Sequence, residues 1–90
     1  MGSGITLWVR AGDAASADAQ RFLRAHGYAA DRVRDLDADP PTEAERAALA
    51  KGGVDLADMR PPVLLTPRGA LSGFRERKWR EFLDIGKGRS

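Results

Sequence analysis

The sequence predicts an α/β domain with a four-stranded mixed sheet and helices on both of its faces. Strand-like and helix-like patterns alternate in the order β-α-β-α-β-β-α. The first β-α-β unit requires a right-handed crossover and gives a parallel pair of strands. A hairpin later in the chain adds an antiparallel pair. No internal repeat or linker divides the 90 residues, which suffice for one hydrophobic core.

The first strand and the first helix are predicted from the pattern of apolar residues. Residues 5–9 are β-branched, aromatic and mostly apolar, as in a strand buried on both faces. Asp13 or Ser16 can cap the helix that follows, and Gly27 is a natural stop after it. Its apolar stripe recurs at helical spacing and comprises Ala15, Ala19, Phe22, Leu23 and His26.

The second strand and the second helix follow a stretch broken by Asp39-Pro40-Pro41. Residues 32–36 alternate polar and apolar side chains, which suits a strand within the sheet or at its edge. Thr42 and Glu45 form a capping box for a helix over residues 43–50. We expect its apolar face to carry Ala44, Ala47 and Ala48, with Leu49 as a further candidate. Gly52-Gly53 ends it, and residues 54–59 are a loop or one short helical turn.

The last part of the chain reads as a hairpin followed by a helix. Residues 63–66 and 70–72 are the two strands, joined by a tight turn at Pro67-Arg68-Gly69. The final helix directs Trp79, Phe82 and Leu83 inward, and Trp8 on the first strand is also expected in the core. Residues 1–4 read as the remnant of a tag, residues 5–85 as a single domain, and residues 86–90 as a flexible tail.

The composition excludes several classes of function. The chain contains no cysteine, so it cannot exchange thiols and disulfides or hold a metal through thiolates. The acidic run Asp35, Asp37 and Asp39 lacks histidine or cysteine partners, and no metal is expected there. No apolar run approaches the ~20 residues that a membrane span needs. With no signal peptide visible, a cytoplasmic location without a membrane partner is expected.

The charge pattern gives no reason to expect nucleic-acid binding. The net charge is +2, from 15 basic and 13 acidic residues. Basic residues gather towards the C-terminal end, but Glu76, Glu81 and Asp84 are interleaved with them, as on a solvated helix face. A nucleic-acid interface needs a less diluted basic patch.

Three ordered positions resemble the thioredoxin fold in its short glutaredoxin form. The first is Arg10-x-Gly12-Asp13-x-x-Ser16, between a strand and a helix. The second is Pro62, followed by Val63-Leu64-Leu65, where the family has a cis-proline. The third is Gly73-Phe74, where it has a glycine motif before the last helix. Segments 34–36, 39–42, 60–61 and 73–79 also resemble the arsenate-reductase-like branch, although the chain is too short for its helical insertion.

The resemblance places Asp13 and Ser16 at the two cysteine positions of the redox motif. An ionised Asp13 carboxylate is expected to cap the helix, or to mimic a thiolate or an oxidised cysteine. Ser16 is a poor nucleophile without a base. His26 lies about ten residues along the same helix, roughly 15 Å away. His26 is therefore too far away to act as a base for Ser16, and we expect no catalytic residue. Near the C-terminal end of the helix, His26 is expected to interact with the helix dipole.

The resemblance also concerns glutathione. Arg10 corresponds to the residue that contacts a glutathione carboxylate, or it forms a local ion pair with Asp13. Pro61, before the expected cis-proline, lacks the N–H that the family offers to a bound thiol peptide. Ser72 and Arg75 replace a glycine and an aspartate of the family. These departures weaken the case for glutathione, which stays a possible ligand with no other cofactor expected.

The sequence therefore favours a redox-inactive binding module for an unidentified protein or peptide partner. The alternative is a glutathione-dependent thiol oxidoreductase or arsenate reductase homologue whose cysteines were lost or replaced. A third hypothesis is that the domain binds glutathione without catalysing a reaction. Candidate residues of the binding groove are Arg10, Gly12, Asp13, Ser16, Pro61, Pro62, Gly73, Phe74 and Arg75.

Overall fold

The computed structural model describes residues 4–28, 30 and 32–83. The predicted tag remnant, apart from Gly4, lies outside the described residues, and so does the predicted tail over residues 86–90. No helix in the described part of the chain is long and apolar enough to cross a membrane.

The sheet has four strands in the order β2-β1-β3-β4, with β2 and β4 at its edges. β1 (Thr6–Val9) pairs in parallel with β2 (Arg32–Asp35). It pairs antiparallel with β3 (Val63–Thr66), which forms a hairpin with β4 (Gly69–Ser72). The mixed sheet, the parallel pair and the hairpin are all as predicted, and β2 lies at an edge.

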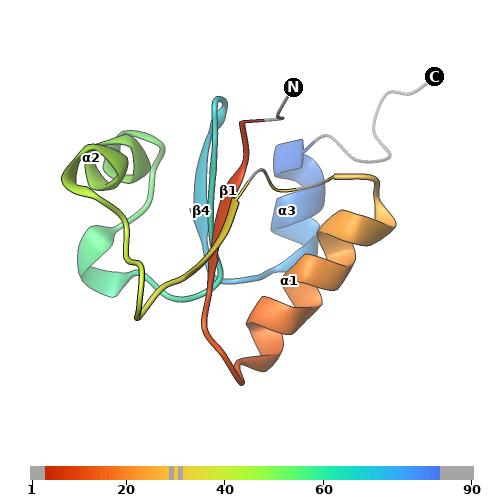
Figure 1. Cartoon of the computed structure of the whole chain (residues 1–90). Coiled ribbons are helices and arrows are strands. Elements are labelled where there is room, and N and C mark those ends of the chain that lie inside the picture. Colours follow the sequence, from red (N-terminus) through yellow and green to blue (C-terminus); the bar gives the residue numbers. More distant parts are fainter. Residues whose placement is uncertain (1–3, 29, 31, 84–90) are drawn as a thin grey trace.

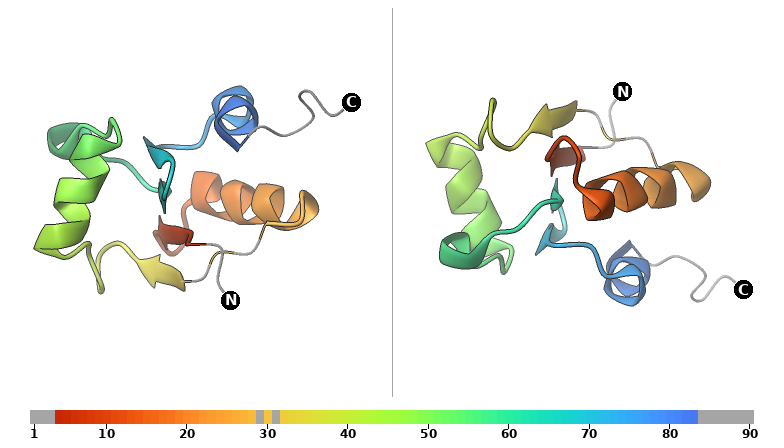
Figure 2. Two further views of the ribbon diagram at one scale, coloured as in Figure 1. Left: turned by 90° about the horizontal axis from the view of Figure 1, so that it is seen from above. Right: turned by 90° about the horizontal axis from the view of Figure 1, so that it is seen from below.

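Helices cover both faces of the sheet. α1 (Ala14–Ala25) and α3 (Glu76–Leu83) lie on one face, and α2 (Glu43–Lys51) lies on the other (Figures 1 and 2). Together with the 3-10 turn η1 (Leu56–Asp58), they give the predicted order β-α-β-α-β-β-α.

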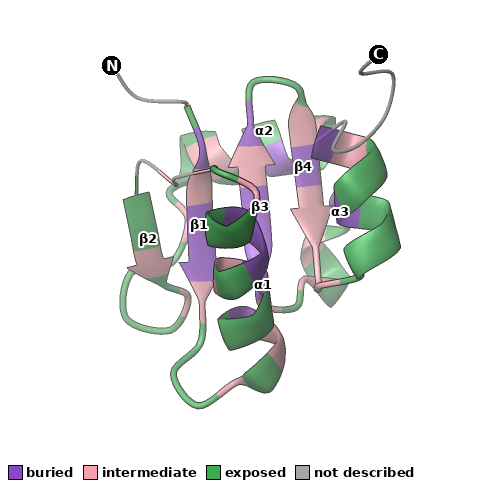
Figure 3. Cartoon of the chain, turned by 90° about the vertical axis from the view of Figure 1, so that its right-hand side faces the viewer, coloured by how far each residue is buried: buried purple, intermediate pink, exposed green. Residues whose placement is uncertain are grey.

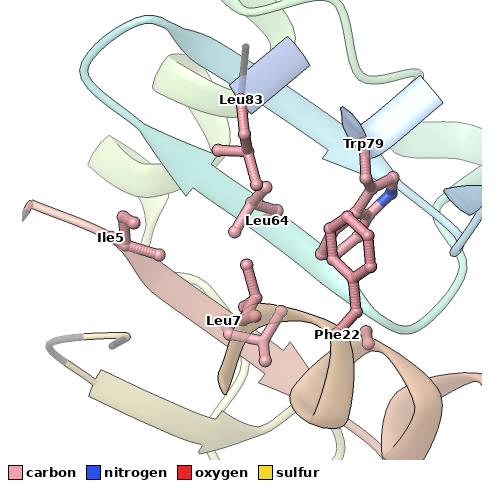
Figure 4. Close-up of a cluster of buried hydrophobic side chains, with 8 residues drawn as sticks. Ile5, Leu7, Phe22, Leu64, Trp79 and Leu83 are labelled. Carbon is pink, nitrogen blue, oxygen red and sulfur yellow. The ribbon is translucent and has the colours of Figure 1, made fainter. Parts of the chain in front are cut away.

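β1 is buried on both faces, so it contributes to two hydrophobic clusters. Leu7 belongs to the first cluster, between the sheet and α1 and α3; Figure 4 labels Ile5, Leu7, Phe22, Leu64, Trp79 and Leu83. Trp8 belongs to the second, under α2, with Leu49, Val54, Val63 and Ala70. The core positions predicted for Trp8, Trp79 and Leu83 are confirmed, and Phe82 packs at the margin.

The helix ends lie where the sequence places their stop and start signals. Gly27 follows the C-cap of α1 with a φ of +78°, a conformation that glycine adopts without strain. Thr42 and Glu45 form the predicted capping box at the start of α2, and Gly52 caps its end.

The predicted apolar face of α2 is wrong for Ala44, Ala47 and Ala48, which are all exposed. Leu49 is the buried residue of this helix, and Glu45, one turn earlier, is half-buried on the same side. The helix turns Glu45 inward because the carboxylate binds a guanidinium there, and alanine gains little by burial because its side chain is small.

That guanidinium belongs to Arg34 of β2, which joins three segments of the chain. It donates to both oxygens of Glu45 at 2.7 and 2.6 Å, and to both oxygens of Asp39 at 2.9 Å. Its central carbon also lies 5.1 Å from the ring centroid of Trp8. The Arg34 side chain is only 11% exposed, so its carboxylate partners offset the cost of burying its charge.

Acid is expected to weaken this network. The hydrogen bond from Arg34 lowers the pKa of Asp39. Burial acts to raise the pKa of Glu45, but hydrogen bonds from Arg34 and Thr42 outweigh it, and the net shift is downward. Carboxylates whose pKa is lowered by folding stabilise the native state above their unfolded-state pKa, and this stabilisation is lost as pH falls through the native pKa.

Because the unfolded-state values are about 3.9 for Asp and 4.3 for Glu, the loss should begin near pH 5 and grow as pH falls. Urea unfolding at intervals between pH 7 and pH 3 measures it. The variant Arg34→Met should lose less stability over this range than the natural protein. Equal losses would show that the acid sensitivity arises elsewhere.

Candidate functional site

Four loops meet at one end of the sheet, and they carry all the candidate residues of the groove. β1 and β2 end there, β3 begins there and β4 ends there, as the register Trp8↔Val63↔Ser72 requires. Figure 3 shows the β1–α1 loop and the β4–α3 connection at this same end. Residues far apart in the sequence, from Arg10 to Arg75, are thereby brought to one region of the surface.

Asp13 and Ser16 form a closed hydrogen-bonded unit at the start of α1. The Asp13 Oδ2 atom accepts from the backbone N–H of Ser16 and from its hydroxyl, both at 2.8 Å. Ser16 Oγ in turn accepts from the Arg10 backbone N–H at 3.1 Å. Ser16 is only 2% exposed, so its hydroxyl is committed to these contacts. The predicted cap by Asp13 is confirmed.

Asp13→Ala is expected to lower the free energy of unfolding by about 1–2 kcal/mol, because the helix loses its cap and the Ser16 hydroxyl loses an acceptor. Asp13→Asn keeps an oxygen at the capping position and should cost less. Urea unfolding of the three proteins measures the difference. If Asp13→Ala were as stable as the natural protein, the cap would have no structural role.

Arg10 forms its ion pair with Asp37 rather than with Asp13, so the predicted pair is wrong. Its Nε and Nη2 atoms lie 3.0 Å from the two oxygens of Asp37, in the loop after β2. This hydrogen bond lowers the pKa of Asp37 and raises the pKa of Arg10. The Asp13 carboxylate is turned towards the helix, which explains why it does not bind the guanidinium. Within the acidic run, the sequence offered no signal that selects Asp37.

The peptide bond between Pro61 and Pro62 is cis, as the resemblance implied. The surrounding loop is fixed by its neighbours. Gly73 N–H donates to the carbonyl oxygens of Pro62 at 2.8 Å and of Arg60 at 3.0 Å, and Trp79 Nε1 donates to Gly73 O at 3.0 Å. Pro62 is fully buried. No hydrogen bond from the described residues reaches the Pro61 carbonyl.

A cleft of about 630 Å³ contains part of the predicted groove. Gly73, Phe74 and Arg75 line it, together with Arg60, Ser72 and Lys78 and with residues of the α2–η1 connection. The other predicted residues lie at the same end of the sheet but not in this cleft: Arg10, Gly12, Asp13, Ser16, Pro61 and Pro62. Arg60 and Lys78 were not predicted to line a groove, although both lie in segments that resemble the arsenate-reductase-like branch.

His26 is the C-cap of α1, at the end of that helix remote from Asp13. Its ring centroid lies 4.7 Å from that of Phe22, in a tilted aromatic contact. Among the described residues, no group of histidine, aspartate and glutamate side chains could hold a metal ion.

Comparison with solved structures establishes the fold. An ArsC family related protein from Bacteroides fragilis superposes with a TM-score of 0.74 at 15% identity, covering 91% of this chain and 99% of its own. A mutant of the thioredoxin-like protein BC3987 gives 0.65 at 20% identity, over 91% and 96%. A glutaredoxin from Archaeoglobus fulgidus gives 0.59 at 16%, over 90% and 86%. No family model matches the chain and no curated protein does. The fold is therefore thioredoxin-like.

Proposed function

We propose that this domain is a redox-inactive binding module, which holds a peptide or a segment of a partner protein at the loop end of its sheet. The observation that carries the proposal is the Asp13–Ser16 unit. It occupies the start of α1, where a redox-active relative would carry thiols. The Ser16 hydroxyl donates a hydrogen bond to the Asp13 carboxylate, so both groups are already engaged. The sequence holds no cysteine that could replace them.

The backbone at this end of the sheet supports binding rather than chemistry. The Pro61 carbonyl is without a hydrogen bond in the described part of the chain, so it can accept one from an extended ligand. Arg10 is engaged by Asp37, which leaves it less available for a glutathione carboxylate. Recognition through fixed backbone groups and adjacent pockets is a common mode of peptide binding.

The proposal is tested by two measurements on the natural protein. It should show no turnover of a glutathione mixed disulfide in a standard reductase assay. Peptides selected from a random displayed library should bind it and shift NMR signals of residues 10–16, 60–63 or 72–75. The turn at residues 67–69, at the opposite end of the sheet, should stay unshifted. Measurable turnover, or selected peptides that map only to the opposite end, would overturn the proposal.

Asp13→Cys tests whether the start of α1 still stabilises an anion. Its thiol should be more ionised at pH 7 than a free cysteine. The Ser16 N–H and hydroxyl, which donate hydrogen bonds to the Asp13 carboxylate, can donate them to a thiolate instead. Alkylation by iodoacetamide should be several-fold faster than in the control Ala47→Cys, on an exposed position inside α2. Equal rates would show that the start of α1 gives a thiolate no additional stabilisation.

A further inference from the structure

β4 forms an edge of the sheet, and half of its backbone groups face away from β3. Gly73 N–H donates to Pro62 O, and the register pairs Leu71 with Leu64. Because hydrogen-bonded and non-hydrogen-bonded pairs alternate along an antiparallel ladder, Ala70 and Ser72 direct their N–H and C=O groups outward. These are the groups with which an additional strand could pair.

Only one of these two residues is open to a partner. A Cβ atom placed on Gly52 would lie 2.7 Å from the Ala70 nitrogen, so the end of α2 closes over this part of the edge. Ser72 instead lines the cleft of about 630 Å³ described above. Its side chain is fixed by Arg60, whose N–H donates to Ser72 Oγ at 2.8 Å. The Ser72 backbone groups have no partner among the described residues.

The charged side chains that line this cleft are positive on balance, with Arg60, Arg75 and Lys78 against Asp55 and Asp58. Arg75 and Lys78, at the start of α3, form no ion pair with any described residue, and Arg77 beside them forms none either. Of the two acidic residues, Asp58 pairs with Arg60 at 3.3 Å, whereas the Asp55 carboxylate accepts from the backbone N–H of Ala57 at 3.0 Å and forms no ion pair with a described residue. An incoming acidic side chain can therefore bind Arg75 or Lys78 without breaking an existing ion pair.

We propose that this cleft binds an extended acidic segment of a partner protein. The segment pairs with the outward N–H and C=O of Ser72 as a short additional strand, and its carboxylates lie against Arg75 and Lys78. The inference rests on the proposed binding function and assigns it a location and a partner chemistry. Backbone pairing supplies the orientation of the segment, and the two cations supply the preference for acidic sequences.

The probe is a blocked seven-residue peptide, Ser-Glu-Val-Asp-Val-Glu-Ser, titrated into the isotopically labelled protein. Signals of Ser72, Gly73, Arg75 and Lys78 should shift, and the Ser72 amide should exchange more slowly with solvent. The same peptide with lysine at its three acidic positions should bind more weakly. A third version of the peptide carries methyl groups on the backbone nitrogens that would pair with Ser72. It should also bind more weakly, because these nitrogens can no longer donate hydrogen bonds to β4.

The variant Arg75→Glu/Lys78→Glu should weaken binding about ten-fold, a change of about 1.4 kcal/mol in binding free energy. The matched control is Arg24→Glu/Arg46→Glu, which changes the net charge equally at two exposed arginines outside the cleft. Its effect should be small and should vanish at high salt. Thermal unfolding of both variants checks that they remain folded.

Any one of the following outcomes overturns the inference. One is the absence of any shift at millimolar acidic peptide. Another is equal weakening by the two double variants, which would make the attraction a matter of net charge alone. The third is a concentration-dependent shift of Ser72 without peptide, which would mean that a second copy of the chain occupies the edge. If library peptides instead shift residues 10–16 and leave Ser72 unchanged, the location fails while the proposed binding function stands.

Discussion

Trp79→Ala is expected to lower the free energy of unfolding by about 3–5 kcal/mol, the usual cost of removing a large aromatic side chain from a core. Trp79 is fully buried, and its ring makes edge contacts with Phe22 and Phe74, with centroids 6.4 and 5.0 Å away. Its Nε1 also donates to the Gly73 carbonyl. The residue therefore fixes both the packing of α3 and the loop that lines the cleft.

Trp79→Phe separates these two contributions, because it keeps an aromatic ring and removes the hydrogen bond to Gly73. It should cost less than Trp79→Ala, yet NMR signals of Gly73 and Phe74 should shift in both variants. Urea unfolding supplies the stability of each protein. A loss below about 1 kcal/mol for Trp79→Ala would contradict the packing of α3 against α1 and the sheet.

Arg34→Met is the second large change, with an expected loss of about 2–3 kcal/mol in the free energy of unfolding. Methionine can fill much of the space, but it leaves Glu45 half-buried without its cation, which is strongly unfavourable. The expected loss is smaller than for a fully buried pair because Asp39 is 62% exposed and can be solvated by water. This contact and the buried Leu49 together hold α2 against the sheet.

Arg32→Met is the matched control, since Arg32 lies on the same strand and is exposed. It should change the stability by less than about 0.5 kcal/mol. If Arg34→Met lowered the free energy of unfolding no more than this control, the Arg34 network would contribute nothing measurable to the stability of the fold. The double variant Arg34→Met/Glu45→Met should recover part of the lost stability, because the uncompensated carboxylate is removed.

The order of the elements could be predicted from the sequence because the chain marks their ends with local signals. Asp13, Thr42 and Gly27 act within a few residues of themselves, so their effects do not depend on the rest of the fold. The face of α2 could not be predicted in this way. Its many alanines fit a buried or an exposed position almost equally. Which face of α2 turns towards the sheet depends on Arg34, which lies on β2.

The site was predictable to a similar extent. The cap by Asp13 was predicted from a local pattern, and the cis-proline at Pro62 from the resemblance to the glutaredoxin family. The sequence could not supply the partner of Arg10, since an exposed arginine can reach several carboxylates and the loop after β2 decides between them. Nor could it show that Gly73, Phe74 and Arg75 line a cleft separate from Asp13, because clefts arise from the spacing of whole elements.

The Asp13 cap has a consequence for any anion that approaches α1. The carboxylate is an intramolecular competitor, tethered three residues from the N–H group that it occupies. A tethered group competes at an effective concentration far above that of a dissolved metabolite. A free thiolate or carboxylate ligand would therefore meet a site that is already saturated. Thiol chemistry at this position would require the removal of this internal ligand as well as the introduction of a cysteine, and a single Asp13→Cys change accomplishes both.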